Sequence, residues 1–231
     1  MLESIAFIPD GNRRFAKLNK INLAQSYSLG TEKAWDVVKW LSNYPSITTG
    51  TFYTFSLKNF ERSKGELNIL MKIFQMQLDK VLAGKMLKEQ EVKINFIGRR
   101  DSFPKKLQEK MLKVETVTAD YKSKTINLAL GYDGQTEIVD ASKKFAQDVA
   151  NGVVLADTLT TDSFKKYLYS DFKSPDLIVR TSNEQRLSGF LTYQSSYSEL
   201  AFLDKYWPQI TESDVAKVVS EYEQRERRFG K

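Results

Sequence analysis

The segment that decides the fold reads Ile5-Ala6-Phe7-Ile8-Pro9-Asp10-Gly11-Asn12-Arg13-Arg14-Phe15-Ala16-Lys17. Its first four residues are apolar, as expected of a strand that is buried on both faces of a parallel sheet. Pro9 ends this strand because proline has no N–H group to donate to a neighbouring strand. Asp10, Gly11 and Asn12 favour a turn, after which a helix is expected to begin at about Arg13. The segment therefore predicts a carboxylate at the carboxyl edge of a sheet.

This corner has the chemistry of a phosphate site. In open α/β sheets, ligands bind at the carboxyl ends of the strands. Backbone N–H groups at the start of a helix and the guanidinium groups of Arg13 and Arg14 suit a phosphate. The carboxylate of Asp10 suits the Mg²⁺ ion that usually accompanies phosphates. On this segment alone, an ordinary strand–turn–helix corner with surface arginines is an equally good interpretation.

The composition fits one globular domain, expected to span residues 1–231 with a sizeable core. The chain contains no Cys and no His. The lack of Cys excludes disulfides and fits a reducing cytosol. The lack of His excludes a Ser-His-Asp triad and His-ligated zinc, so any metal must be bound by oxygen atoms.

Charge and hydropathy narrow the range of partners. The net charge of +6 favours phosphates, nucleic acid or an acidic membrane surface. No apolar run approaches the ~20 residues of a membrane span. The N-terminus also lacks the charged segment and apolar core of a signal peptide. We therefore expect a cytoplasmic protein.

Strand-like and helix-like segments alternate along the chain. Besides the first strand, strands are expected at residues 51–55, 92–97, 125–130, 176–180 and 199–203. Helices are expected at residues 31–41, 66–87, 104–121, 135–149, 161–169 and from 211 onward. This alternation predicts an α/β fold with a mostly parallel sheet of about six strands flanked by helices.

The helix expected at residues 66–87 is apolar on two faces. One stripe consists of Leu67, Leu70, Met71, Phe74, Leu78 and Val81, and a second consists of Ile69, Ile73 and Met76. A helix with two apolar faces is buried on two sides. Packing between the sheet and neighbouring helices is the simpler interpretation, and the wall of a long apolar cavity is the alternative.

Three polar clusters follow predicted strands, at residues 10–14, 56–62 and 180–188. In a parallel sheet they converge on one edge. The candidate carboxylates there are Asp10, Glu184 and Glu199, the guanidinium groups are those of Arg14, Arg62, Arg180 and Arg186, and the amide is Asn59. Several arginines with carboxylates suit a diphosphate and Mg²⁺.

Taken together, these segments resemble the cis-prenyltransferases, the family of undecaprenyl and dehydrodolichyl diphosphate synthases. The matching segments are residues 10–17, 55–64, 127–132, 175–188 and 197–200, and Arg228-Phe229-Gly230 matches the Arg-x-Gly motif at the family's C-terminus. The resemblance runs nearly end to end and in order. The Asn-Arg-Arg form of the first motif resembles the archaeal and eukaryotic branch.

The resemblance implies a transferase. Such an enzyme adds isopentenyl diphosphate repeatedly to an allylic diphosphate such as farnesyl or geranylgeranyl diphosphate. Each new double bond is cis, Mg²⁺ is the cofactor, and the product is a long-chain polyprenyl diphosphate for lipid glycan carriers. The helix at residues 66–87 then becomes one wall of an apolar product tunnel beside the sheet.

The resemblance also implies roles for individual residues. Asp10 and Asn59 are the catalytic residues, and Asp10 and Glu199 are the metal ligands. Asn59 is not basic, so Asp10 or a diphosphate oxygen is a better proton acceptor. The substrate-binding residues are Gly11, Asn12, Arg13, Arg14, Phe15, Ser56, Leu57, Lys58, Phe60, Arg62, Glu66, Arg180, Glu184, Arg186, Leu187, Ser188, Arg228 and Gly230.

Two positions depart from the family pattern. Leu23 and Tyr27 occupy places where many relatives carry an Arg and a His. In those relatives the Arg adds to diphosphate binding and the His joins a hydrogen-bond network. Tyr27 can donate a hydrogen bond but cannot gain a proton at neutral pH. The departures affect the first-substrate site and leave the reaction class unchanged.

The resemblance further implies a homodimer in which the C-terminal tail acts in the partner's site, with peripheral contact at the inner face of the cell membrane. A non-catalytic subunit of a heteromeric synthase is the alternative. Such subunits lose residues that this chain keeps at Asp10, Asn59 and Arg62, so catalysis is favoured.

Two other functions are not expected. Nucleic-acid binding is disfavoured because the basic residues do not form runs before the tail. A trans-prenyltransferase is disfavoured because that all-helical family needs Asp-Asp motifs, which this chain lacks.

Overall fold

The computed structural model describes residues 1–84 and 86–225. Six strands form one sheet: β1 (Ser4–Ile8), β2 (Thr49–Ser56), β3 (Val92–Ile97), β4 (Lys124–Tyr132), β5 (Leu177–Arg180) and β6 (Glu199–Phe202). Their order is β3-β4-β2-β1-β5-β6, and every neighbouring pair is parallel. The predicted parallel α/β sheet of about six strands is thus confirmed.

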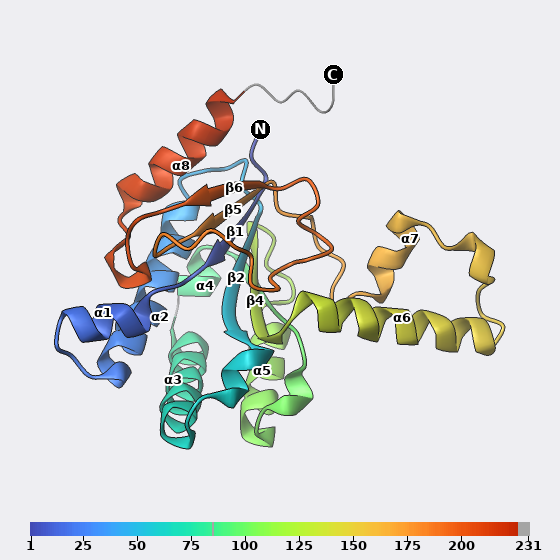
Figure 1. Ribbon diagram of the computed structural model, residues 1–231, viewed down its shortest axis with the longest axis horizontal. Helices are drawn as coiled ribbons and strands as arrows, with labels where there is room; N and C mark the ends of the chain where they lie inside the picture. The colour runs from blue at the N-terminus through green and yellow to red at the C-terminus, as the bar shows by residue number, and fades with distance from the viewer. Residues whose placement is uncertain (85, 226–231) are drawn as a thin grey trace.

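Helices connect these strands (Figure 1). The α-helices are α1 (Asn12–Leu18), α2 (Leu23–Leu41), α3 (Lys64–Ala83), α4 (Met86–Glu89), α5 (Lys105–Thr118), α6 (Gly134–Ala150), α7 (Thr161–Phe164) and α8 (Glu212–Gln224). Short 3₁₀ helices are η1 (Leu57–Glu61), η2 (Arg100–Ser102), η3 (Ala156–Thr158), η4 (Lys165–Tyr167) and η5 (Trp207–Gln209). The elements follow the predicted alternation, but two predicted helices are divided. The helix predicted at residues 66–87 corresponds to α3 and α4, and the one predicted at residues 161–169 corresponds to α7 and η4.

The largest difference in bounds is the start of α2, which lies eight residues before the predicted position at Thr31. Asn22 caps this helix by accepting a hydrogen bond from the backbone N–H of Gln25, and the side chain of Gln25 accepts one in return from Asn22. Such a reciprocal cap fixes where a helix begins. The earlier start places Tyr27 on α2, facing α3.

The two faces of the sheet are covered differently. Alternate residues of β1 point to opposite sides, so Ile5 and Phe7 belong to the main core while Ala6 and Ile8 belong to a smaller one. Side chains of α2, α3, α5 and α8 complete the main core, and Phe190 and Leu191 from the segment before β6 help to complete the smaller one. In Figure 1, α6 runs away from the sheet as an arm.

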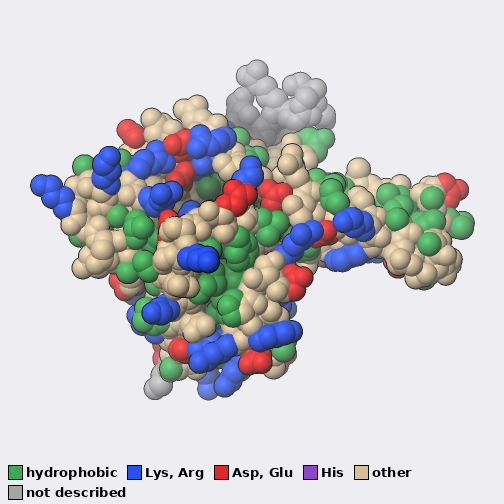
Figure 2. Space-filling view, turned by 60° about the horizontal axis from the view of Figure 1, so that its bottom comes forward, with side chains coloured by type: hydrophobic (Ala, Val, Ile, Leu, Met, Phe, Trp, Pro, Cys, Tyr) green, Lys and Arg blue, Asp and Glu red, His purple; other side chains and the backbone are tan. Residues whose placement is uncertain are grey.

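Charge on the surface is mixed. On the face shown in Figure 2, Lys and Arg side chains alternate with Asp and Glu around a group of apolar side chains. A nucleic-acid-binding surface gathers its basic side chains into one patch or stripe. This face carries no such stripe.

Candidate functional site

The three predicted polar clusters follow strands that are neighbours in the sheet. β2, β1 and β5 lie side by side, and the clusters begin where these strands end. Nη2 of Arg180 donates a hydrogen bond to Oδ2 of Asp10 at 2.8 Å, which joins the first and third clusters. The structure therefore brings these two clusters together at the carboxyl edge, as the strand order predicts.

The turn after β1 is held rigidly. The backbone N–H of Asp10 donates to Oγ1 of Thr181 at 2.9 Å, and the same hydroxyl donates to the carbonyl of Asp10 at 2.7 Å. Gly11 has φ of 101°, and a Cβ atom there would lie 2.7 Å from the ring of Tyr206 and 2.8 Å from Oγ of Ser182. Only glycine fits this position without strain. The turn thus fixes where the carboxylate of Asp10 lies.

Arg14 lies between two carboxylates. Its Nη1 is 2.8 Å from Oε1 of Glu184 and its Nη2 is 3.4 Å from Oδ1 of Asp10. The guanidinium group also lies over the ring of Tyr206, 5.9 Å from the ring centre. Glu184 pairs with Arg186 as well. Burial would raise the pKa of Glu184, but the hydrogen bonds from Arg186 and Arg14 outweigh it and lower the pKa.

Arg180 is the buried cation of the site, with only 5% of its side chain exposed. Besides Asp10, its guanidinium group donates to Oγ of Ser188 at 2.9 Å and to the backbone carbonyl of Arg186. Its Nε is buried and has no hydrogen-bond partner among the described residues. A fixed guanidinium group that lines a cavity is suited to an anionic ligand.

Residues of η1 form the second cluster. Oδ1 of Asn59 accepts a hydrogen bond from the backbone N–H of Ser56 at 3.1 Å, which leaves the NH₂ group of Asn59 as a donor. Phe60 packs against Phe55, with ring centres 4.8 Å apart, so it belongs to an aromatic cluster. Lys58 is exposed. This geometry makes Asn59 a hydrogen-bond donor more readily than a base.

Glu66 and Arg62 meet Tyr27 beside the second cluster. The hydroxyl of Tyr27 donates to Oε1 of Glu66 at 2.5 Å, and Nη1 of Arg62 donates to both of them at 2.9 and 3.0 Å. Nε of Arg13 lies 3.8 Å from the same carboxylate oxygen. Burial is the main reason that the pKa of Tyr27 rises above its ordinary value, and the hydrogen bond to Glu66 adds to it.

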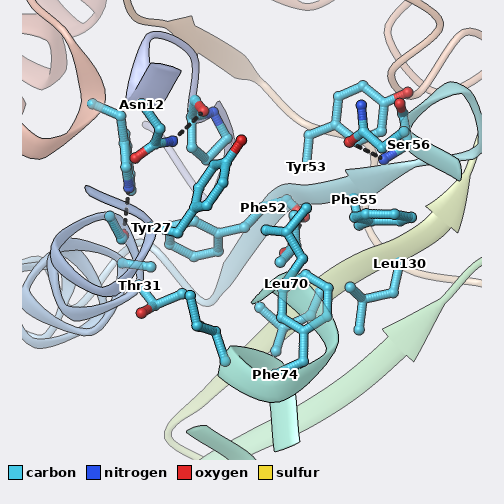
Figure 3. A pocket seen from close by; sticks show the side chains of 18 of the residues that line it. Asn12, Tyr27, Thr31, Phe52, Tyr53, Phe55, Ser56, Leu70, Phe74 and Leu130 are labelled. Carbon is cyan, nitrogen blue, oxygen red and sulfur yellow. Dashed lines mark hydrogen bonds between the residues drawn. The ribbon is translucent and has the colours of Figure 1, made fainter. Parts of the chain in front are cut away.

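Beside these groups, a cavity of about 340 Å³ opens between α2, α3 and the sheet. Its polar lining includes Asp10, Asn59, Arg62, Arg180 and Ser188. Most of the remaining lining is apolar and comes from β2, β4, α3 and α5, including Phe52, Phe55, Leu70, Ile73, Phe74, Leu78, Met111 and Leu130. In Figure 3, Leu70 and Phe74 of α3 face Phe52 and Phe55 of β2. Helix α3 is therefore both a packed helix and a cavity wall.

Glu199 does not lie with the other site residues. It is the first residue of β6 and pairs with Leu177, which in turn pairs with Ile5. Asp10 lies five residues beyond Ile5, a distance of roughly 16 Å along the strands. Glu199 instead pairs with Arg225, with Oε2 and Nη1 2.9 Å apart. The expectation that Asp10, Glu184 and Glu199 share one edge therefore fails for Glu199 within a single chain.

The remaining predicted residues vary in position. Asn12 lines the cavity, and its Oδ1 is buried without a hydrogen-bond partner among the described residues. Phe15 is half-buried, and Leu23 and Leu187 pack against the cores. Leu57 is partly buried in η1. Arg228 and Gly230 lie outside the described residues.

Several further side chains contribute to the site and were not predicted as site residues. Thr181 holds the backbone of Asp10, Tyr206 packs on Arg14, and Trp35 donates to Gln77 at 3.3 Å in the cavity wall. Thr181 directly follows the end of a predicted strand, and this position by itself indicates a residue at the site. Nothing in the local sequence indicates the other three, because their contacts depend on how distant elements pack.

Comparison with known proteins agrees with this geometry. The family model for undecaprenyl diphosphate synthase matches residues 8–230. A tritrans,polycis-undecaprenyl-diphosphate synthase (geranylgeranyl-diphosphate specific) from Pyrobaculum aerophilum is 38% identical over 230 residues, covering 98% of this chain and 95% of that protein. A protein of the same name from Methanocaldococcus jannaschii is 39% identical, covering 98% of this chain and 82% of its own length.

A solved structure is also similar over the whole chain. The crystal structure of lavandulyl diphosphate synthase from Lavandula x intermedia, in complex with dimethylallyl diphosphate, has a TM-score of 0.94 and 29% sequence identity. The match covers 100% of this chain and 98% of that one. The similarity thus extends from the sequence to the arrangement of all six strands.

Proposed function

Since the chain belongs to the undecaprenyl diphosphate synthase family of prenyltransferases, we propose that it elongates geranylgeranyl diphosphate with isopentenyl diphosphate. Each addition forms one carbon–carbon bond, expels diphosphate from the allylic substrate and releases one proton from isopentenyl diphosphate. The new double bonds are cis, and the product is a long-chain polyprenyl diphosphate for lipid glycan carriers. The choice of primer is supported by the names of the archaeal relatives.

The observation that carries this proposal is the contrast between the two parts of the cavity. Guanidinium and carboxylate groups from the segments at the carboxyl ends of β1, β2 and β5 line part of it, and apolar side chains line most of the rest. Diphosphates need fixed cationic donors, whereas a growing isoprenoid chain needs only an apolar space. The cavity can therefore bind the diphosphate group and the apolar chain of the same molecule.

Two arginines would act on the diphosphate groups. Negative charge builds up on the leaving diphosphate during each addition, and donors that are already fixed stabilise it without rearranging. Arg180 is fixed by burial and by its bonds to Asp10 and Ser188. Arg14 is held by Glu184, from which a diphosphate can draw it. We assign Arg180 to a permanent binding role and Arg14 to a role that depends on the ligand.

The residues present fit Mg²⁺. The carboxylate of Asp10 lies at the cavity beside these arginines, and Mg²⁺ commonly binds one or two carboxylates together with substrate phosphates and water. Within the described residues, no three acidic side chains form a cluster able to hold a metal ion. Substrate oxygens would therefore complete the coordination of an ion held by Asp10. When bound, Mg²⁺ adds positive charge where diphosphate departs.

The proton released from isopentenyl diphosphate needs an acceptor. Asn59 presents its NH₂ group after its oxygen has bonded to Ser56, so Asn59 suits the binding of a phosphate or carboxylate oxygen. We assign the acceptor role to a diphosphate oxygen or to Asp10, and an orienting role to Asn59. A heteromeric, non-catalytic role is less well supported because Asp10, Asn59 and Arg62 all line the cavity.

We also propose that the active form is a homodimer. Glu199 and Arg225 lie together at the amino end of β6, far from Asp10 of the same chain. A role for Glu199 as a metal ligand therefore requires the Asp10 of a partner chain. The tail with Arg228 and Gly230 follows Arg225 and would act in the same partner site.

Contact with a membrane surface is part of the proposal. None of the described helices combines the length and apolar character needed to cross a bilayer. Products of many isoprene units are insoluble in water, so we expect their release to limit turnover. Steady-state rates should therefore rise severalfold when detergent or vesicles are added, while a single round of condensation should not change. Steady-state rates that do not change when detergent is added would indicate a short product.

One incubation tests the proposed function. Purified protein receives Mg²⁺, radiolabelled isopentenyl diphosphate and, in separate tubes, dimethylallyl, farnesyl or geranylgeranyl diphosphate. Chromatography of the dephosphorylated products gives chain length and primer preference. Long cis-polyprenols from geranylgeranyl diphosphate are the expected result. Coupling confined to dimethylallyl diphosphate, or no product with any primer, would contradict the proposal.

A further inference from the structure

Three side chains form a closed hydrogen-bonded triangle between α2 and α3. Tyr27 donates to Glu66, and one nitrogen of Arg62 donates to both of them. Tyr27 and Glu66 are each only 8% exposed. Every bond in the triangle is 3.0 Å or shorter. These short hydrogen bonds to two buried partners restrict the position of the arginine, whose own side chain is 25% exposed.

The three residues differ in their access to the cavity. Tyr27 and Arg62 line it, whereas Glu66 is buried and is not among the lining residues. A molecule in the cavity therefore meets Tyr27 and Arg62, which are the hydrogen-bond partners of Glu66. Its carboxylate is balanced by Arg62 and, at 3.8 Å, by Arg13. The substrate-binding role expected for Glu66 from the sequence must then be indirect.

Arg62 still has donors to offer. Among the described residues, only its Nη1 forms hydrogen bonds, so Nε and Nη2 are left for a ligand. The neighbouring polar groups of the cavity are those of Asp10, Asn59 and Arg180. A guanidinium group held at one nitrogen and open at the others can bind an oxyanion without first being immobilised.

We propose that Tyr27 and Glu66 are positioning residues that hold Arg62 ready to bind the diphosphate group of a substrate. This inference rests on the proposed function. The Tyr27 hydroxyl donates its hydrogen bond to Glu66, so its oxygen is free to accept one from Arg62. A tyrosine can fill this place because it provides one donor and one acceptor in the neutral state.

The chain contains a matched control cluster. Tyr169 donates to Oδ2 of Asp140 at 2.5 Å, and Arg99 binds the same carboxylate at 2.8 and 3.0 Å. This second triad has the same tyrosine–carboxylate–arginine composition, but none of its members lines the cavity. Tyr169→Phe therefore removes the same kind of hydrogen bond from outside the candidate site.

The test measures binding without turnover. Isothermal titration calorimetry with geranylgeranyl diphosphate, and separately with inorganic pyrophosphate, compares wild type, Tyr27→Phe, Glu66→Gln and Tyr169→Phe. We expect Tyr27→Phe and Glu66→Gln to weaken both ligands about tenfold, because a hydrogen bond to a charged group is lost. Tyr169→Phe should bind as wild type does. In the steady state, KM should rise more than kcat falls.

A second measurement separates positioning from simple structural support. In an Arg62→Ala background, Tyr27→Phe should no longer change the affinity, because the group that it positions is absent. Unchanged affinity in the single Tyr27→Phe variant, or a further loss of affinity in the Arg62→Ala background, would overturn the inference. Wild-type protein that binds both ligands through this triangle but makes no polyprenol would contradict the proposed function and still support the inference.

Discussion

The side chain of Asp10 faces the cavity and also pairs with a buried arginine. About 29% of its side chain is exposed at the cavity, while its Oδ2 neutralises the buried guanidinium group of Arg180. Arg180 keeps its bonds to Ser188 and to the carbonyl of Arg186 if the carboxylate is removed. The loss of Asp10 should therefore abolish chemistry and also lower stability, because the buried charge of Arg180 loses its counter-ion, while the fold itself persists.

We predict that Asp10→Ala lowers turnover about 10³-fold or more, with a lower melting temperature and an unchanged circular dichroism spectrum at room temperature. Asp10→Asn is the companion variant, because it keeps the size of the side chain and removes the charge. Both should be inactive at saturating Mg²⁺. Near-normal activity in either variant would show that the carboxylate does not hold the metal.

Gly11 supports this corner by its backbone conformation. A Cβ atom there would contact Tyr206 and Ser182 at distances under 3.0 Å, and φ is positive. Gly11→Ala should lower the free energy of unfolding by about 1–3 kcal/mol and also reduce activity. Gly65 in α3 is the control, since nothing lies within 4 Å of its added Cβ. Gly65→Ala should stabilise the protein by up to about 1 kcal/mol in urea unfolding. Equal changes in the free energy of unfolding for the two substitutions would show that the backbone of Gly11 does not require glycine.

At the scale of single residues, the sequence predicted best where chemistry follows a strand end directly. Asp10 and Arg180 come immediately after or at the end of apolar strands, and they do form an ion pair. Tyr206 and Gln77 were not predicted because their partners are far away in the chain. No local pattern distinguishes a tyrosine that packs on an arginine from an ordinary surface tyrosine.

At the scale of elements, one ion pair anchors the base of the α6 arm. Asp140 of α6 binds Arg99, which follows β3, and accepts a hydrogen bond from Tyr169. The hydrogen bond from Arg99 is the main reason that the pKa of Asp140 lies below its ordinary value, although burial opposes the shift. Linkage then requires that the ionised carboxylate stabilises the folded state.

The pH dependence of this contribution has a definite sign. An unfolded Asp has a pKa of about 3.9, and the folded value for Asp140 is lower. The stabilisation is therefore fully present above about pH 4 and is lost as the pH falls through the folded pKa. Asp140→Asn should lower the free energy of unfolding by about 1 kcal/mol at pH 7, and the difference from wild type should shrink below pH 4.

Urea unfolding at pH 7, 5, 4 and 3 provides the measurement. Asp157→Asn in the exposed η3 is the control, and it should have little effect at any of these pH values. A difference for Asp140→Asn that grows as the pH falls would show that the sign is wrong.

The elements themselves were largely predictable, because strands and helices have different periods of apolar residues. The start of α2 was predicted too late, at Thr31, because the reciprocal cap of Asn22 and Gln25 was not recognised in the sequence. For α3, a pattern of apolar residues cannot distinguish a packed surface from the wall of a cavity. That distinction depends on the gap between α2, α3 and the sheet.

At the scale of the whole molecule, the parallel sheet separates the two predicted metal ligands. Asp10 follows the end of β1, whereas Glu199 starts β6. In a parallel sheet, a residue that begins one strand and a residue that follows the end of a different strand lie at opposite edges. The predicted strand at residues 199–203 already implies this separation, because a residue that begins a parallel strand cannot share an edge with one that follows a strand.

The separation leads to a complementation experiment on the proposed homodimer. Asp10→Ala and Glu199→Ala are each expected to be inactive. If one site uses Asp10 of one chain and Glu199 of its partner, a mixed dimer contains one site with both residues intact. The other site of that dimer carries both defects. Mixing the variants under conditions that exchange subunits should therefore restore activity, and Asp10→Ala mixed with Arg228→Ala should behave alike.

The structure supplies the negative control for this experiment. Asp10 and Arg180 are hydrogen-bonded at 2.8 Å within one chain, so each site needs both from the same chain. In a mixed dimer of Asp10→Ala and Arg180→Ala, each site carries one defect, and the mixture should stay inactive. Subunit exchange is checked with two affinity tags in both mixtures. If Asp10→Ala with Glu199→Ala also stays inactive after proven exchange, Glu199 does not act in the partner's site. Glu199 would then have no role at the metal, because roughly 16 Å of sheet separates it from Asp10 of its own chain.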